Sequence, residues 1–308
     1  MSKYASGITK LKIPTYDYTP APGWSYSRNK TLRECLRKYW FTYYGKKYAD
    51  PAIREKIIKI KHLVSLPLVL GEILHQSIAQ ALENLKETGV CPAMETMISV
   101  SEKALEKSLE TRQFIEENGG GGINSCKVTA AMQRLHESIG NFYSHPLLPQ
   151  IISSIIERPE YVLIDPSGYG ECRIEGKKAF AKTDLIYSSP EGSTIIVDWK
   201  LSNGHPMENL TQLSGYLYYA MNVLHQPLAN LQARMIYLSS QEDDLILTAT
   251  QEKAELIKSR ILAELKNIED CCIDPLHNIP QPMEYFSKKM NPSICSYCKY
   301  RHLCRECT

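Results

Sequence analysis

Residues Lys182–Tyr219 read KTDLIYSSPEGSTIIVDWKLSNGHPMENLTQLSGYLYY, and they carry the strongest structural signal in the sequence. It begins with two short runs of apolar and β-branched residues, which are typical of adjacent strands. Asp184 lies in the first run, and Asp198 and Lys200 lie in the second. Because residues two apart in a strand point to the same face, Asp198 and Lys200 are expected to project together, with Trp199 on the opposite face.

These side chains have the chemistry that metal-assisted phosphodiester cleavage requires. Carboxylate oxygens are the ligands that Mg²⁺ and Mn²⁺ prefer. The ammonium of Lys200 beside the same cation would orient a water or offset charge developing on phosphorus. A helix expected over 207–224 then carries Gln212 and Tyr216, one turn apart. An ordinary half-buried hairpin with surface charges is the alternative, because an Asp-x-Lys triplet is common in any sequence.

The overall composition indicates an ordinary globular protein. Of the 308 residues, 43% are hydrophobic and 23% are charged, and the length allows one large or two small domains. The net charge of +2 neither requires nor excludes a nucleic-acid partner, so a basic groove would have to be local. No apolar run approaches the ~20 residues that cross a bilayer, so no membrane contact is expected. Ten cysteines and no recognisable secretion signal favour the reducing cytoplasm, and hence metal or thiol chemistry rather than disulfides.

Hydrophobic spacing predicts a helical N-terminal half and an α/β core behind it. Helices are expected over 25–44, 51–62, 66–85, 93–117, 126–158 (interrupted by Pro146 and Pro149), 207–224 and 251–268, and strands over 160–165, 171–187, 194–201 and 229–238. The clearest break is NGGGGIN at 118–124, because four consecutive glycines have no preferred backbone conformation. A linker is the expected role, since no Gly-Lys-Ser/Thr follows that would make a phosphate-binding loop.

Four regions follow from this pattern. They are an N-terminal arm (1–24), a helical region (25–158), an α/β core (159–270) and a C-terminal region rich in cysteine (271–308). The helical region contains Cys35 and an insertion over 86–155. The insertion resembles nothing with a known role, so it is expected to serve specificity or the docking of a partner.

The C-terminal segment 295–307 reads CSYCKYRHLCREC and holds four cysteines. Two metal sites are compatible with this spacing. Either Cys295, Cys298, Cys304 and Cys307 form a local zinc site, or three of them join a remote cysteine around an iron–sulfur cluster. A cluster that used Cys35 would join the first helix to the last residues, and its binding energy would contribute to folding. Free cysteines in a frayed tail are disfavoured by the density of the segment.

Six motifs together resemble those of the PD-(D/E)XK nucleases of the RecB-type branch. The resemblance is closest to the iron–sulfur members, which include CRISPR-associated exonucleases, the bacterial AddB nuclease domain and related helicase–nucleases. The motifs are WSYSRNKTLRECLRKYWFTYYG (24–45), LGEILHQ (70–76), KTDLIY (182–187), VDWK (197–200), QLSGY (212–216) and the C-x2-C-x5-C spacing of 295–304. Each motif is weak alone, but their order and spacing are specific. The resemblance covers most of the chain outside 86–155.

This resemblance implies a restriction-endonuclease-like core, in which helices flank a mixed central sheet. The catalytic metal would be Mn²⁺ or Mg²⁺. Its ligands would be His75, Asp184, Asp198 and the main-chain carbonyl of Trp199. An imidazole ligand suits Mn²⁺ somewhat better than Mg²⁺. Lys200 would assist the nucleophile. The residues implied to hold that lysine or the scissile strand are Gln212 and Tyr216. The ligands implied for a [4Fe–4S] cluster are Cys35, Cys295, Cys298 and Cys304, with Cys307 as an extra ligand or a spare thiol.

Three positions depart from the family pattern. Thr183 stands where the motif has a proline, and Asp198 stands where many relatives have glutamate. The shorter reach of aspartate would shift the metal slightly. Cys307 is additional to the cluster spacing and keeps zinc at the C-terminal cysteines as an alternative.

The resemblance also implies a metal-dependent DNA nuclease, expected to be an exonuclease on single-stranded DNA or DNA ends. Its setting would be CRISPR adaptation, DNA repair or defence, with protein partners from such a complex. Two alternatives remain: a non-catalytic nucleic-acid-binding subunit on a nuclease fold, and a zinc-stabilised interaction protein. The intact set of acids, lysine and histidine argues against the first, and metal analysis would distinguish the second.

Other charged and aromatic residues are weaker candidates. The lysines that would grip phosphates, or simply form a solvated strand face, are Lys177, Lys178 and Lys182. The aromatic and basic run 37–47 would stack unpaired bases, although packing around the cysteines is the more economical role. Glu157 and Glu160 precede the first strand and are minor candidates for a peripheral metal or water ligand.

Overall fold

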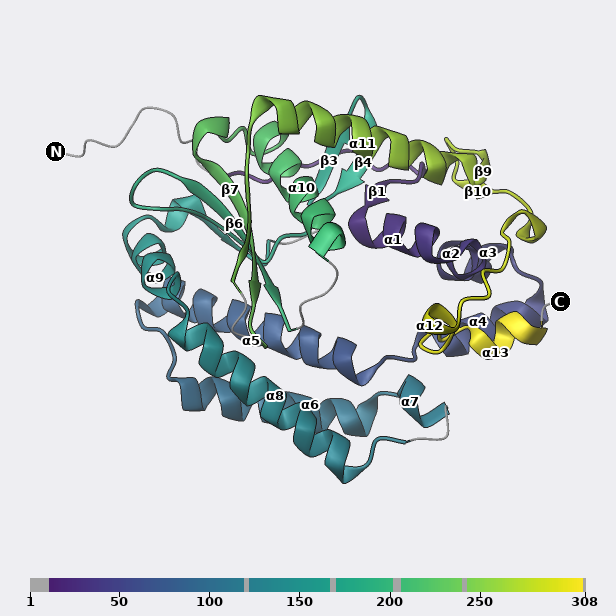
Figure 1. The fold of residues 1–308 in the computed structure, drawn as a ribbon, viewed down its shortest axis with the longest axis horizontal. Coiled ribbons are helices and arrows are strands. Elements are labelled where there is room, and N and C mark those ends of the chain that lie inside the picture. The colour runs from purple at the N-terminus through teal and green to yellow at the C-terminus, as the bar shows by residue number, and fades with distance from the viewer. Residues whose placement is uncertain (1–10, 119–121, 167–169, 202–205, 240–242, 307–308) are drawn as a thin grey trace.

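The computed structural model describes residues 11–118, 122–166, 170–201, 206–239 and 243–306. Its centre is a mixed sheet with the strand order β2-β5-β6-β7-β8. These strands are β2 (Val162–Ile164), β5 (Leu185–Ser188), β6 (Thr194–Lys200), β7 (Leu231–Tyr237) and β8 (Leu245–Thr248). β6 and β7 are parallel, and the other neighbouring pairs are antiparallel. Figure 1 shows helices on both faces of this sheet, so the expected α/β fold with a mixed central sheet is confirmed.

Alternation along β6 separates two apolar layers. Ile195, Val197 and Trp199 belong to one layer, with α5 (Leu66–Thr88), α6 (Met94–Thr111), α8 (Ser125–Ser144) and α9 (Leu148–Glu157). Ile196 belongs to the other, with α10 (Pro206–Asn222) and α11 (Gln251–Asp270). Asp198 and Lys200 alternate in step with Ile196, so they point toward the α10 side of the sheet, as the strand pattern predicted.

The segment 86–155 is part of the main core. Its helices are α6, α7 (Ile115–Asn118), α8 and the first turns of α9. Phe142 of α8 is fully buried, and its ring meets the ring of Trp199 edge-on at 5.4 Å. The helical segment predicted over 126–158, with interruptions at Pro146 and Pro149, is two helices, α8 and α9, separated near Pro146. Within the predicted glycine break, residues 119–121 lie outside the described residues.

The predicted helix over 25–44 is also broken. It consists of α1 (Tyr26–Glu34) and α2 (Leu36–Tyr43), followed by α3 (Gly45–Tyr48) and α4 (Pro51–Lys61). The break falls at Cys35, whose backbone is extended (φ −165°, ψ 121°). Just after the break, the main-chain N–H of Arg37 donates to the carbonyl of Ser287 at 3.2 Å, which is a tertiary contact in place of a hydrogen bond within the helix.

The prediction of one strand over 171–187 is wrong. The segment forms β3 (Glu171–Ile174) and β4 (Lys177–Phe180), and then crosses to β5 in the central sheet. Glu175 and Gly176 join β3 to β4 with positive φ values of 51° and 79°, which is the backbone of a two-residue hairpin turn. β1 (Trp24–Ser25) completes this small sheet in the order β1-β4-β3.

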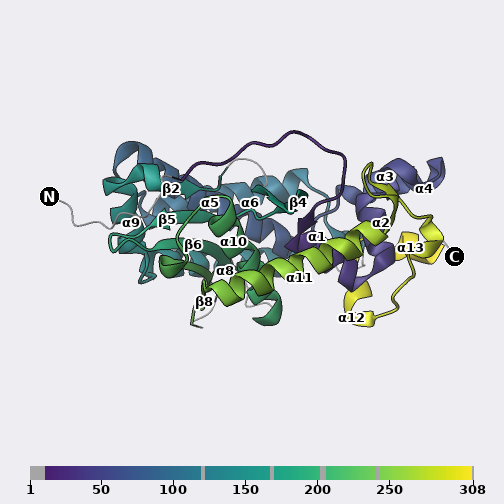
Figure 2. The same cartoon turned by 90° about the horizontal axis from the view of Figure 1, so that it is seen from above.

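The C-terminal region returns to the N-terminal helices. It contains β9 (Cys272–Asp274), β10 (Ile279–Pro280), α12 (Pro292–Cys295) and α13 (Arg301–Glu306). In Figures 1 and 2 the yellow α12 and α13 lie beside the purple α2 and α4. The Arg37 guanidinium donates to the carbonyl of Phe286 at 2.8 Å, and the rings of Phe41 and Tyr300 are 5.4 Å apart. Among the described helices, none combines the length and apolarity needed to span a membrane.

Candidate active site

A cavity of about 510 Å³ lies between α5 and the C-terminal end of β6. One wall is α5, and the opposite wall comes from β6, α10 and the residues before β5. Every residue that the sequence predicted for catalysis lines this cavity: His75, Asp184, Asp198, Trp199, Lys200, Gln212 and Tyr216. Side chains separated by up to about 140 residues of sequence are therefore brought to one place.

Asp184 lies directly before β5 and is held from two directions. Its Oδ1 is 2.9 Å from Nδ1 of His75, and its Oδ2 accepts a hydrogen bond of 2.9 Å from the main-chain N–H of Trp199. Burial is the largest influence on the pKa of His75 and lowers it. The hydrogen bond and charge of Asp184, with the charge of Asp198, outweigh burial, so the pKa of His75 is raised.

Asp198 is almost fully enclosed, with only 3% of its surface exposed. Its Oδ1 accepts a hydrogen bond of 2.6 Å from the Tyr216 hydroxyl and a longer one of 3.2 Å from the Gln212 amide. That amide also donates to the Tyr216 oxygen at 2.6 Å. Gln212 and Tyr216 thus contact the second acid, whereas the sequence analysis expected them to contact the lysine or the scissile strand.

Burial makes the ionised form of Asp198 less favourable than it would be in water. Burial has the largest effect and raises the pKa of this carboxyl; Lys200 lowers it, and the nearby charge of Asp184 raises it again. The net direction is upward. A strongly buried acid beside a second acid is a common feature of functional sites, where a bound cation stabilises both charges.

Trp199 contributes its backbone and its packing. The indole lies in the layer formed by α5 and α8, on the opposite face from Asp198 and Lys200. The main-chain N–H of Trp199 holds Asp184, and the buried ring fixes the position of that N–H. Trp199 therefore fixes the position of Asp184 relative to Asp198. Its carbonyl as a metal ligand stays a prediction.

The donor set is suited to a hard divalent cation. Oδ2 of Asp198 is buried and forms no hydrogen bond of normal geometry, although Nζ of Lys200 lies 2.6 Å away. One carboxylate lies directly before β5, the other lies on the neighbouring strand β6, and His75 adds a nitrogen. Over the described ranges, no group of three or more His, Cys, Asp or Glu side chains is arranged to hold a metal ion. Because His75 and Lys200 already pair with the acid oxygens at 2.9 and 2.6 Å, a cation would have to displace both contacts, after which His75 would be available as a ligand.

A separate cavity of about 270 Å³ is lined by the cysteines that the sequence singled out. They are Cys35, Cys295, Cys298 and Cys304. Burial and the nearby thiols of Cys35 and Cys295 raise the pKa of Cys298, while Lys38 lowers it. The rim is strongly basic, with Lys38, Lys288, Lys289, Arg301 and Arg305. Cys307, the fourth ligand of the local zinc alternative, lies outside the described residues.

The remaining candidates are distributed differently. Lys177 forms an ion pair with Glu269 at 2.6 Å, and Lys178 contacts the carbonyl of Thr19, so both are directed away from the acids. Lys182 does line the site. Neither Glu157 nor Glu160 is among the residues that line it.

Two acids at the cavity were missed. Glu72 lies within the LGEILHQ motif, and Asp165 follows β2, where its N–H donates to the carbonyl of Asp184 at 2.7 Å. Their positions beside a motif and at a strand end were the available signals.

A profile of the PD-(D/E)XK nuclease superfamily matches residues 23–305, which include both cavities. The comparison with curated proteins finds no match. The superfamily consists largely of hydrolytic nucleases that use divalent metals such as Mg²⁺ or Mn²⁺, with DNA as the implied substrate, and some members are inactive. The match extends over nearly the whole chain and agrees with the gathering of acids, lysine and histidine, so this protein belongs to the PD-(D/E)XK nuclease superfamily.

Proposed function

We propose that this protein is an active, metal-dependent DNA nuclease of the RecB-type branch, and that it acts as an exonuclease on single-stranded DNA or DNA ends. One observation carries the proposal: His75, Asp184, Asp198 and Lys200 meet in one cavity. Burying the charge of Asp198 beside Asp184 lowers stability. An inactive relative would have no reason to keep this arrangement.

Each side chain would have a distinct role. Mg²⁺ or Mn²⁺, held by His75, Asp184, Asp198 and the Trp199 carbonyl, would activate a water and neutralise charge on the scissile phosphate. Lys200 is 26% exposed, so its ammonium reaches the cavity, where it orients the attacking water and donates to a phosphate oxygen. The hydrogen bonds from Tyr216 and Gln212 fix Oδ1 of Asp198, which directs Oδ2 toward the lysine.

We also propose a structural [4Fe–4S] cluster on Cys35, Cys295, Cys298 and Cys304. Their shared cavity supports this set over a local zinc site, because a local site has no use for Cys35. Protein purified anaerobically should be brown, with a broad absorption shoulder and matching iron and sulfide contents. Zinc without iron or sulfide would support the alternative.

The setting that we propose is CRISPR adaptation, DNA repair or defence, with protein partners from one of these systems. The genes that neighbour this one test the setting directly. The neighbouring genes test the proposed setting and protein partners, and they do not test the chemistry of the active site.

Cleavage of end-labelled single- and double-stranded DNA tests the activity. With Mn²⁺ or Mg²⁺ we expect products that EDTA abolishes, and a loss of at least roughly 10²–10³-fold in rate in Asp198→Asn and Lys200→Met. Asp244→Asn is the matched control, because Asp244 also pairs with a histidine, His145, at 3.2 Å in a different cavity. Unchanged cleavage in Asp198→Asn and Lys200→Met would contradict the site. DNA binding without cleavage by the wild type would support a non-catalytic subunit.

A further inference from the structure

A second cavity, of about 520 Å³, adjoins the active site. The two cavities share Lys182, Gln212 and Tyr216 as lining residues. The rest of the second cavity, here called the α1 pocket, is lined by Gly23, Ser25, Tyr26, Ser27, Arg28, Tyr43, Phe180 and Ala181. Its volume lies within the range of roughly 300–1,000 Å³ that is usual for sites of small ligands.

The two cavities differ in charge. The active site is lined by Glu72, Asp165, Asp184 and Asp198. Among the described residues that line the α1 pocket, none is acidic, and Arg28 and Lys182 are cationic. Aromatic rings line it as well, from Tyr26, Tyr43 and Phe180. An acidic lining, as in the active site, suits a metal ion. Cationic groups beside aromatic faces, as in the α1 pocket, suit phosphates and unpaired bases.

Arg28 is the main cation of the α1 pocket. Its Nε donates to the Tyr39 hydroxyl at 2.8 Å, and its Nη2 donates to the Tyr44 hydroxyl at 3.3 Å. None of the ion pairs among the described residues involves this guanidinium, and its side-chain hydrogen bonds go to the two phenols. A partly enclosed arginine that is held by neutral phenols keeps its full charge for an anion from outside.

Tyr43 offers a flat surface beside that charge. Its side chain is among the exposed large hydrophobics, at 37%, and the Arg28 guanidinium lies over its ring at 4.6 Å from the centroid. The ring of Tyr39 lies 4.8 Å from the ring of Tyr43 at an interplanar angle of 40°, so a base would stack on the part of the Tyr43 ring that lines the α1 pocket, with its phosphate close to a cation.

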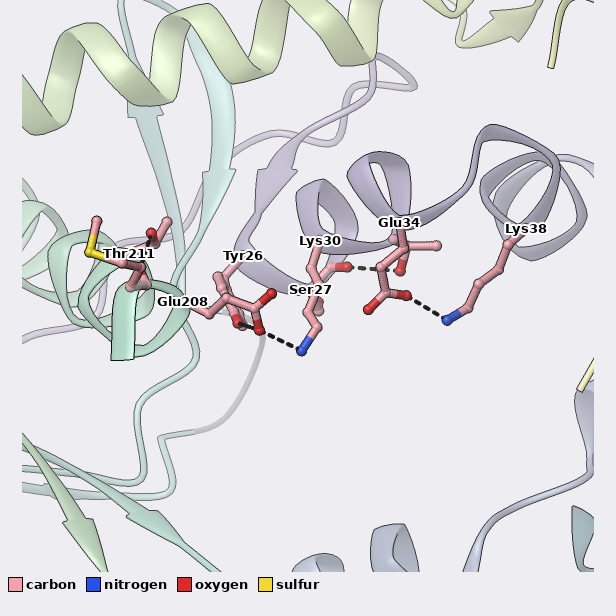
Figure 3. A network of polar contacts seen from close by, with 9 residues as sticks. Tyr26, Ser27, Lys30, Glu34, Lys38, Glu208 and Thr211 are labelled. Carbon is pink, nitrogen blue, oxygen red and sulfur yellow. Dashed lines mark hydrogen bonds and ion pairs between the residues drawn. The ribbon is translucent and has the colours of Figure 1, made fainter. Parts of the chain in front are cut away.

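The wall formed by α1 is fixed to the nuclease core. Figure 3 shows Tyr26 and Lys30 of α1 directed toward Glu208 at the start of α10, with Lys30 Nζ 2.9 Å and the Tyr26 hydroxyl 3.3 Å from one carboxylate oxygen. Trp24 adds a hydrogen bond of 2.7 Å to Glu264 of α11. The α1 pocket is therefore held in a defined position relative to Asp198.

We propose that the α1 pocket binds the nucleotide next to the scissile phosphate of single-stranded DNA, with Tyr43 stacking on its base and Arg28 and Lys182 binding its phosphate. The proposal rests on the proposed function, because the pocket is assigned through its continuity with the cleavage site. It deepens that function by naming residues that select an unpaired strand, since stacking on Tyr43 requires a base free of its partner.

Binding of a fluorescein-labelled oligothymidylate in EDTA, followed by anisotropy over a range of salt concentrations, tests the proposal. Tyr43→Leu should weaken binding by roughly 5- to 150-fold at every salt concentration, the usual contribution of one stacked base. Arg28→Gln should lower the slope of log affinity against log salt by about 0.7, the value for one phosphate of a single strand. Tyr43→Trp should bind at least as tightly as the wild type.

Arg158→Gln and Tyr161→Leu are the matched controls. Arg158 lies over the Tyr161 ring at 4.8 Å, away from both cavities, and we expect neither variant to change affinity or slope. Lys182 is 57% exposed, so Lys182→Gln should fold normally and should also lower the slope by about 0.7. This variant keeps the test valid if Arg28→Gln unfolds.

Affinity within twofold of the controls, together with a salt slope equal to theirs, in all the pocket variants would overturn the inference. If the wild type cleaves DNA in that case, the proposed function stands and only the α1 pocket is wrongly assigned. If the wild type neither binds nor cleaves, the proposed function itself fails.

Discussion

Replacing Tyr216 with phenylalanine removes one oxygen atom that holds Asp198. The hydroxyl donates to Oδ1 at 2.6 Å and accepts from Gln212 at 2.6 Å. Because the pKa of Tyr216 is raised well above its usual value by burial and by the adjacent carboxylates, the hydroxyl stays protonated and remains a donor. In Tyr216→Phe, Oδ1 of Asp198 keeps only the longer hydrogen bond of 3.2 Å from the Gln212 amide.

The expected magnitude follows from this contact in two ways. A hydrogen bond to a charged group contributes about 1.5–3 kcal/mol to stability. Loss of a partner that orients a metal ligand costs roughly 10- to 100-fold in metal affinity or activity, which is about 1.4–2.7 kcal/mol. The two ranges agree. We therefore expect Tyr216→Phe to lower the free energy of unfolding by about 2 kcal/mol and to raise the Mn²⁺ concentration for half-maximal cleavage by roughly 10- to 100-fold.

Tyr219→Phe is the control within the same helix. Tyr219 is as buried as Tyr216, but its hydroxyl has no hydrogen-bond partner among the described residues, so its removal should leave stability unchanged or slightly higher. Urea unfolding and Mn²⁺ titrations of cleavage provide both measurements. Equal effects of the two substitutions, or an unchanged Mn²⁺ requirement in Tyr216→Phe, would refute the role of Tyr216 in positioning Asp198.

Three further outcomes are expected. Cys35→Ser should abolish the brown colour and the iron content of anaerobically purified protein, whereas Cys126→Ser, on the exposed side of α8, should keep both. Phe142→Ala should lower the free energy of unfolding by about 3–5 kcal/mol in a urea titration, because the ring is fully buried against Trp199. Burial raises the pKa of Cys172 to about 12, so a short pulse of iodoacetamide at a pH of about 8 should leave it unmodified while Cys126 reacts; modification is read by mass spectrometry, and equal labelling of both thiols would contradict its burial.

The elements around the site were predictable because their signals are local. β6 is a run of β-branched residues, and α5 and α10 have helical spacing with the motifs placed on them. The alternation of Asp198, Trp199 and Lys200 followed from strand geometry alone. The contacts of α10 could not be predicted in the same way. They depend on the angle at which the helix crosses the sheet, because that angle determines which strand residue Tyr216 reaches.

Two errors have different physical origins. The Glu175-Gly176 turn is a local signal, but the strand propensity on both sides concealed it. The break at Cys35 has no local signal, since it depends on the carbonyl of Ser287, which replaces a helical acceptor for Arg37. The helices of 86–155 likewise show their role only in three dimensions, where Phe142 covers Trp199.

The shared cavity of Cys35 and residues 295–304 has a consequence for biosynthesis. These cysteines are separated by about 260 residues of sequence, which a ribosome adds at roughly 5–20 residues per second. The aromatic surface of α2 and the thiol beside it thus remain uncovered for roughly 13–50 seconds of translation. Nascent chains stalled in this interval should be the forms most prone to oxidation and chaperone capture.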